Sequence, residues 1–159
     1  MGCSIAAMSS LRSVWQLGVN SEEEKAISNL SMVRILLVDD FAAWRRYVLE
    51  NLRRNRNLQV VDVASDGLEA VFKAEVLQPD LILLDIGLPK LNGIEAARRI
   101  RKLAPDSKII FLTQESSADS VETALSLGAR GYVVKAEAER DLLAAVEAVM
   151  LGRTFVSST

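Results

Sequence analysis

The sequence predicts an α/β fold, namely a doubly wound parallel sheet of five strands in the order 2-1-3-4-5 with helices on both faces. Apolar runs that suit buried strands alternate five times with longer segments whose apolar residues recur at helical spacing. Turn signals built from glycine, proline and Asp-Gly fall between these segments. Strand and helix in regular alternation indicate a parallel sheet whose crossover helices cover it.

The five strands are expected from residue 33 onward, as short and mostly aliphatic runs. The expected ranges are Val33–Val38, Leu58–Ala64, Leu81–Leu84, Lys108–Leu112 and Gly131–Val134. Continuous apolar runs of this length are typical of parallel strands that are buried on both faces. The pattern therefore favours a sheet in the middle of the domain.

A helix is expected after each strand, because apolar residues share a helical face there. The faces expected to pack on the sheet are Trp44, Val48 and Leu52; Leu68, Val71, Phe72 and Val76; Ala97, Ile100 and Ala104; Val121, Ala124 and Leu125; and Leu142, Val146, Val149 and Met150. The boundaries agree with this assignment. Asp66-Gly67 precedes the second helix, and Pro79, Pro105 and Gly128 follow the second, third and fourth.

Length and composition suggest one domain with an extension before it. Residues 1–31 are expected to be an N-terminal extension, either a short helix or disordered, and residues 32–159 a single domain. Ser21 and Glu24 could form a capping box for that short helix. Since Met32 directly precedes the first strand, a spurious extension and a real helical arm both fit.

Several classes of function are excluded by the composition. The net charge is −2, which gives no electrostatic footprint for nucleic acid. The chain contains no histidine, so Ser-His-Asp catalysis and histidine zinc sites are excluded. A single cysteine excludes an internal disulfide and suits a reducing compartment, and residues 1–31 contain no stretch long enough to span a membrane. A cytoplasmic location is expected.

Polar residues stand at the ends of four of the five expected strands. Asp39 and Asp40 end the first strand, Asp85 the third, Thr113 the fourth and Lys135 the fifth. In an open parallel sheet, ligands bind outside the carboxyl ends of the strands, where the strand order reverses. These side chains are therefore expected to converge on one edge of the sheet.

Such a cluster suggests a metal-assisted phosphoryl-transfer site. Three carboxylates repel one another unless a cation or a proton intervenes, and oxygen ligands without histidine or thiolate suit Mg²⁺. Lys135 would add a positive charge for an anion, and Thr113 a hydroxyl donor. A phosphoryl group held in this way beside a carboxylate suits the formation of an aspartyl phosphate.

The same residues carry a family resemblance. The segments "ILLVDD", "LILLDIGLPKLNG", "IIFLT" and "GARGYVVK" follow one another at the spacing of the receiver domain of two-component response regulators. The resemblance covers residue 33 to about residue 155. The last part, "GARGYVVKAEAERDLLAAVEAVMLGRTFVSS", is most similar to the LuxR/FixJ-type branch, whose usual output is a C-terminal helix-turn-helix.

The resemblance implies a role for each site residue. Asp85 would accept a phosphoryl group from the phosphohistidine of a bacterial sensor histidine kinase or phosphotransfer protein. The implied Mg²⁺ ligands are Asp40, Asp85, the backbone carbonyl of Gly87 and, through water, Asp39. Lys135 would pair with Asp85 and its phosphate, Thr113 would bond a phosphoryl oxygen, and Tyr132 would follow Thr113 from an exposed to a buried rotamer. Such a domain assists its own phosphorylation and dephosphorylation and is not otherwise an enzyme.

The fourth helix, fifth strand and fifth helix are the expected switch surface. It comprises Ser116–Gly128, Tyr132 and Asp141–Met150, and a downstream protein or a second copy would bind there; no nucleic acid or membrane is expected. Gln114 follows Thr113 where a small residue is usual in the family, and its bulk is expected to narrow access to Asp85.

Other functions stay open at this point. The chain could be the receiver half of a truncated DNA-binding regulator, since it stops at Thr159. A phosphatase of the haloacid-dehalogenase type needs a second aspartate two residues after Asp85, where Gly87 stands. A flavodoxin-like flavin binder needs a phosphate loop after the first strand, where Asp39 and Asp40 would repel the phosphate.

Overall fold

The computed structural model describes residues 21–22, 32–114 and 117–158. The chain divides into two units, Met1–Ser31 and Met32–Thr159. Ser21 and Glu22 are helical, whereas the rest of the expected extension, Glu24 included, lies outside the described residues, so its assignment stays a prediction. Within the described part of the chain, no helix is long and apolar enough to cross a membrane.

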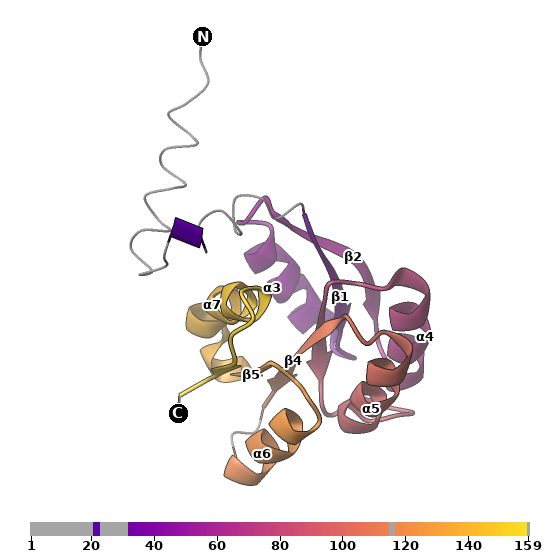
Figure 1. Ribbon diagram of the computed structural model, residues 1–159. Helices are drawn as coiled ribbons and strands as arrows, with labels where there is room; N and C mark the ends of the chain where they lie inside the picture. Colours follow the sequence, from indigo (N-terminus) through magenta and orange to yellow (C-terminus); the bar gives the residue numbers. More distant parts are fainter. Residues whose placement is uncertain (1–20, 23–31, 115–116, 159) are drawn as a thin grey trace. The chain divides into compact units, whose positions relative to one another are not determined.

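The second unit is built on one parallel sheet, in the strand order β2-β1-β3-β4-β5-β6 (Figure 1). The strands are β1 (Val33–Val38), β2 (Leu58–Ala64), β3 (Leu81–Asp85), β4 (Lys108–Thr113), β5 (Gly131–Val134) and β6 (Phe155–Val156). The predicted order of the first five strands is confirmed. β3 and β4 each extend one residue beyond the expected run, so Asp85 and Thr113 belong to the strands themselves.

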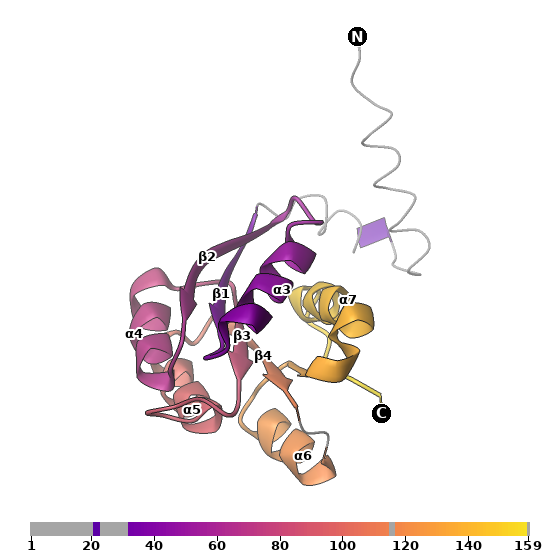
Figure 2. The ribbon, with the colours of Figure 1, turned by 180° about the vertical axis from the view of Figure 1, so that it is seen from behind.

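Helices cover both faces of this sheet, as the alternating pattern predicts. They are α3 (Ala42–Leu52), α4 (Gly67–Leu77), α5 (Gly93–Leu103), α6 (Ala118–Ser126) and α7 (Ala138–Met150), with a short 3-10 turn at Lys135–Glu137. α3 and α7 lie on one face, and α4 and α5 lie on the other (Figures 1 and 2). The fold is thus a three-layer sandwich with the sheet in the middle.

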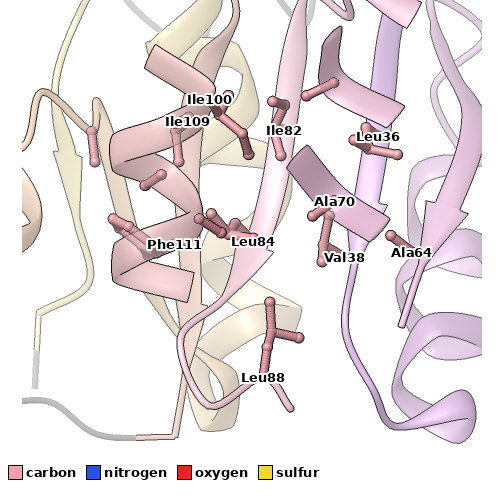
Figure 3. Packing of buried hydrophobic residues seen from close by; sticks show 14 of the residues in the cluster. Leu36, Val38, Ala64, Ala70, Ile82, Leu84, Leu88, Ile100, Ile109 and Phe111 are labelled. Atoms are coloured by element: carbon pink, nitrogen blue, oxygen red, sulfur yellow. The ribbon is translucent and has the colours of Figure 1, made fainter. Parts of the chain in front are cut away.

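Alternate residues of the central strands pack into two separate hydrophobic clusters, because successive side chains of a strand point to opposite faces. Leu36, Ile82, Leu84 and Phe111 pack against α4 and α5 (Figure 3). On the opposite face, Leu37, Leu83, Ile110 and Leu112 pack against α3 and α7. Both faces of the sheet are buried, which explains why the strand sequences are continuous apolar runs and do not alternate between apolar and polar residues.

The expected sheet-facing side of α4 is wrong for three of its four residues. Leu68, Phe72 and Val76 are 49%, 65% and 63% exposed. Ala70 and Ala74 are buried instead, so α4 turns its small residues toward the sheet. Only Val71 of the expected face packs against the core. The three large side chains therefore form an exposed apolar stripe along α4.

The short strand β6 was not predicted. After α7 the chain returns to the sheet, and the Phe155 N–H donates to the Arg130 carbonyl at 3.0 Å. The Ser157 N–H donates to the Tyr132 carbonyl at 2.9 Å, and the Ser157 hydroxyl accepts a bond of 3.1 Å from the Val134 N–H. β6 therefore pairs with β5 along most of its length, and Ser157 ties the end of β5 as well.

Candidate functional site

The carboxyl ends of β1, β3, β4 and β5 meet around one cavity, as expected for this topology. The cavity has a volume of about 830 Å³. Its lining residues are Asp40, Phe41, Trp44, Asp85, Ile86, Gly87, Thr113, Gln114, Ser120, Lys135 and Ala136. Seven site residues were named from the sequence, and five of them line this cavity directly. These five are Asp40, Asp85, Gly87, Thr113 and Lys135.

The three aspartates predicted to cluster do so. One carboxylate oxygen from each of Asp39, Asp40 and Asp85 lies within 4.8 Å of the others. Asp39 and Asp85 are buried, whereas Asp40 is exposed. The three acids therefore differ in their access to solvent, although they share one small region.

Asp39 uses both of its carboxylate oxygens within the protein. Its Oδ1 accepts a bond of 2.9 Å from the Phe41 N–H, and its Oδ2 accepts one of 2.6 Å from the Lys135 ammonium. The Arg45 guanidinium donates to the Asp39 carbonyl at 2.6 Å and holds the turn from β1 into α3. Asp39 is thus better placed to support the site than to bind a ligand directly.

Lys135 reaches the acids from the end of β5. Its Nζ lies 3.5 Å from Asp85 Oδ2, in addition to its bond with Asp39. The same nitrogen lies 5.2 Å from the centre of the Trp44 ring. The side chain is only 11% exposed, so its charge is largely withdrawn from water.

The environment of Asp85 raises the pKa of its carboxyl above the ordinary value. Burial is the main cause, and the negative charges of Asp39 and Asp40 add to it. The positive charge of Lys135 and a bond of 3.3 Å from the Gly87 N–H act in the opposite direction. Because the raising effects prevail, the cluster favours the arrival of a further positive charge.

The loop between Asp85 and α5 is crowded by backbone atoms at its end, at Gly93, and has free space near its start, at Gly87. A Cβ atom at Gly93 would lie 2.0 Å from the Asp85 carbonyl oxygen, and one at Gly67 would lie 1.8 Å from the Leu91 carbonyl oxygen. Both positions therefore require glycine, because backbone approaches too closely for a side chain. At Gly87, in contrast, an added Cβ would meet nothing within 4 Å.

The two expected switch residues are both buried. Thr113 lines the site cavity, and Tyr132 is fully buried in the cluster that contains Phe111. Tyr132 lines a second cavity, of about 580 Å³, which lies between α6, β5 and Ser157. In this structure Tyr132 already has the buried position that the family resemblance assigns to the phosphorylated form.

Trp44 is the site residue that the sequence reasoning missed. Its spacing with Val48 and Leu52 assigned it to the core, and both of these partners are indeed buried. Trp44 does pack against this core, as expected, but it is only partly buried and also lines the cavity. The available signal was its position in the first turn of α3, since helical side chains lean toward the helix N-terminus, which here lies beside Asp39 and Asp40.

Comparison with known proteins gives a consistent family match. Residues 35–147 match the response regulator receiver domain. The chain is 34% identical over 131 residues to the nitrate/nitrite response regulator protein NarL of Escherichia coli K12, which is 82% of this chain and 61% of that protein. It is 32% identical over 126 residues to the response regulator GacA of Pseudomonas syringae, 79% of this chain and 59% of that protein. The chain thus spans about three fifths of these regulators.

Solved structures agree with the sequence matches. A LuxR-family two-component response regulator from Aurantimonas sp. SI85-9A1 superimposes with a TM-score of 0.75 at 34% identity, covering 79% of this chain and 89% of that one. The response regulator domain of Thermotoga maritima CheB gives a TM-score of 0.70 at 34% identity, covering 75% and 96%.

Proposed function

We propose that Asp85 accepts the phosphoryl group, because this chain belongs to the response regulator receiver family. Within this family it belongs to the LuxR/FixJ-type branch, and it is thereby a phosphoacceptor of a two-component system. One observation carries this assignment. Asp85 is the buried acid that lines the cavity, with Lys135 3.5 Å from one oxygen and two further acids beside it. Asp39 has both oxygens bonded, and Asp40 is exposed.

The reaction that this geometry supports is an in-line phosphoryl transfer. A carboxylate oxygen of Asp85 attacks the phosphorus of a phosphohistidine on a sensor kinase or phosphotransfer protein. The phosphorus–nitrogen bond breaks, and the imidazole nitrogen leaves with the electron pair and takes up a proton. Lys135 and Thr113, which line the same cavity as Asp85, serve to hold the phosphoryl oxygens as charge accumulates on them.

The residues present fit a divalent cation of the Mg²⁺ type. Carboxylate and carbonyl oxygens are the ligands that Mg²⁺ prefers, and no soft ligand is near the described cluster. We assign direct ligation to Asp40, Asp85 and the Gly87 carbonyl, and an indirect role to Asp39, whose oxygens are already bonded. When bound, the ion would neutralise the carboxylates and the incoming phosphoryl oxygens.

The output is assigned to the surface formed by α6, β5 and α7. A phosphoryl group adds roughly −1.5 to −2 charge at Asp85 and recruits Thr113 and Lys135. Tyr132 lies on β5, which pairs with the strand that ends at Thr113, and it lines the second cavity, so we assign to it the transmission of a change at Thr113 to that surface. A downstream protein or a second copy then binds according to its different affinity for the two states. Ser116, the first residue expected in this surface, lies outside the described residues.

Two other assignments receive less support. The methylesterase relative from Colwellia psychrerythraea is 43% identical, but the match covers only 27% of its length, so its hydrolase activity is not carried over. A haloacid-dehalogenase-type phosphatase would need a carboxyl at Gly87. The receiver half of a longer DNA-binding regulator is a second proposal, which the comparisons do not favour over the receiver function itself. We assign no nucleic-acid or membrane contact to the described surface.

The test is chemical labelling of Asp85. The full chain is incubated with Mg²⁺ and acetyl phosphate, and Asp85→Asn is treated in parallel. We expect one phosphoryl group per chain, stable to acid and labile to base, on the wild type and none on the variant. Label that persists on Asp85→Asn, or requires no divalent cation, would overturn the assignment.

A further inference from the structure

The Lys135 ammonium is enclosed on three sides in this structure. Asp39 Oδ2 lies 2.6 Å away, Asp85 Oδ2 lies 3.5 Å away, and the face of the Trp44 ring lies 5.2 Å away. We infer that Trp44 is a positioning residue for phosphoryl transfer, which acts by holding the Lys135 ammonium between the two acids. This inference rests on the proposed role of Asp85.

The position of Trp44 on α3 explains how it reaches the lysine. It is the third residue of the helix that starts directly after β1, so its side chain leans back toward the ends of the strands. The turn before it is fixed by the Arg45 bond to the Asp39 carbonyl. Tyr47 also packs against the indole, with ring centres 5.0 Å apart. The ring is therefore held in place and is not a mobile surface group.

The contact has the geometry and the environment in which a cation and an aromatic face attract each other. A separation below about 6 Å from the ring centre is favourable, and indole is the strongest of the natural rings. The attraction grows when the cation is withdrawn from water, and Lys135 is only 11% exposed. A lysine side chain has four flexible bonds, so a third contact restricts it considerably.

Substitutions at Trp44 can test the contribution of its aromatic face separately from that of its volume and its indole nitrogen. Trp44 Nε1 is buried, and within the described part of the chain it has no hydrogen-bond partner. Replacing Trp44 by phenylalanine therefore breaks no hydrogen bond and keeps a weaker aromatic face. Leucine fills part of the volume but has no aromatic face at all. If Trp44 only fills space, Trp44→Phe and Trp44→Leu should have similar phosphorylation rates. If Trp44 positions Lys135, the phenylalanine variant should be the faster of the two.

The first measurement follows Lys135 directly. The ε-methylene protons of a lysine held over an indole face are shifted upfield by the ring current. We expect Lys135 to show this shift in the full-length wild type, to keep part of it in Trp44→Phe, and to lose it in Trp44→Leu. Phe41→Leu removes an exposed ring from the wall of the same cavity and serves as the matched control, with Lys135 signals unchanged.

The second measurement is the rate of phosphorylation by acetyl phosphate with Mg²⁺. We expect Trp44→Leu to be about three- to thirtyfold slower than wild type, which is the factor for losing a partly desolvated cation–aromatic contact. Trp44→Phe should recover a substantial part of the rate, with an unfolding midpoint no lower than that of Trp44→Leu.

The outcomes separate this inference from the proposed function. If the wild type takes up no phosphate, the assignment of Asp85 fails first. If the wild type is phosphorylated on Asp85 and Trp44→Leu matches its rate, or if Lys135 shows no upfield shift in the wild type, the positioning role of Trp44 is wrong. Equal rates for the leucine and phenylalanine variants, both below wild type, also contradict it, because they would indicate a space-filling role.

Discussion

Lys135 is bonded more closely to Asp39 than to Asp85. The ammonium nitrogen lies 2.6 Å from Asp39 Oδ2 and 3.5 Å from Asp85 Oδ2. The lysine therefore mainly compensates the fully buried Asp39, and Asp85 stays the less satisfied of the two acids. On the proposed role of Asp85, this arrangement would leave its carboxylate free to attack and keep a positive charge near the incoming phosphoryl group.

Removing this lysine should cost more stability than removing a surface lysine. We expect Lys135→Met to lower the free energy of unfolding by about 3 kcal/mol, because it leaves the Asp39 carboxylate buried without its cation. Lys73→Met is the matched control. Lys73 also pairs with two acids, but these are partly exposed, so its loss should cost at most about 1 kcal/mol. Urea unfolding in EDTA measures the free energy of unfolding of both variants. Equal decreases in the two variants would contradict a special contribution from the buried Lys135–Asp39 pair.

The raised pKa of Asp85 predicts how stability depends on pH. Because burial above all raises this pKa, the folded state binds the proton more tightly than the unfolded chain does. The ionised group therefore destabilises the fold at neutral pH, and this cost disappears as the pH falls through the folded pKa toward 3.8, the ordinary pKa of an aspartate. We expect Asp85→Asn to be more stable than wild type at pH 7 in EDTA, by roughly 1–4 kcal/mol.

Urea unfolding at pH 7 and at pH 4 provides the comparison. The advantage of Asp85→Asn should shrink at the lower pH, and saturating Mg²⁺ at pH 7 should also reduce it, because the ion then compensates the wild-type charge. Asp40→Asn, at an exposed acid, should gain less. An advantage that grows on acidification would mean that the sign of the shift is wrong.

Two glycines that follow Asp85, Gly87 in the loop and Gly93 at the start of α5, should respond differently to a single methyl group. We expect Gly93→Ala to lower the free energy of unfolding by about 2 kcal/mol or more, because the new Cβ would lie 2.0 Å from the Asp85 carbonyl oxygen. Gly87→Ala should change it by less than about 0.5 kcal/mol, since the space around Gly87 is open. Thermal unfolding of the two variants is the measurement. Similar midpoints would show that the loop relaxes freely.

Ser157 should stabilise the last part of the fold. Its buried hydroxyl accepts from the Val134 N–H at 3.1 Å and also bonds the Asp141 carboxylate. Ser157→Ala leaves both groups without this partner, so we expect a loss of about 1–3 kcal/mol in the free energy of unfolding. Ser158→Ala, at the exposed neighbour, is the control and should have little effect. Hydrogen exchange at Val134 should become faster only in the first variant.

Gln114 should control the lifetime of the phosphate. It is exposed and forms part of the cavity wall next to Thr113. We expect Gln114→Ala to lose its phosphoryl group several-fold faster than wild type, because water then reaches Asp85 more easily. The measurement is the decay of labelled protein after the donor is removed. An unchanged decay rate would show that Gln114 does not limit access.

Much of this architecture follows from local sequence rules. The strands β1 to β5 are runs of aliphatic residues with turn signals on both sides, and each run folds as predicted. The convergence of Asp40, Asp85, Thr113 and Lys135 follows from the parallel topology alone, because all the carboxyl ends of the strands lie at one edge.

The features that were not predicted depend on contacts in space, which a periodic pattern along the sequence does not contain. β6 has two residues, too few to show a pattern, and it forms because the chain after α7 returns to β5. On α4 the apolar face is wide, and the small residues Ala70 and Ala74 face the sheet with Val71 beside them, which leaves Phe72 outside. Helical spacing correctly placed Trp44 against the core, but it did not show that the position of Trp44 beside the end of β1 also brings its ring to Lys135.

The contrast between Gly87 and Gly93 has an evolutionary consequence. A side chain at residue 87 would extend into open space beside the cavity that contains Asp85, whereas one at residue 93 would displace the backbone of Asp85 itself. On the proposed role of Asp85, the speed of the reaction and the stability of the fold would then depend on two different positions. A lineage would change the timing of its signal through residue 87 and keep the domain intact.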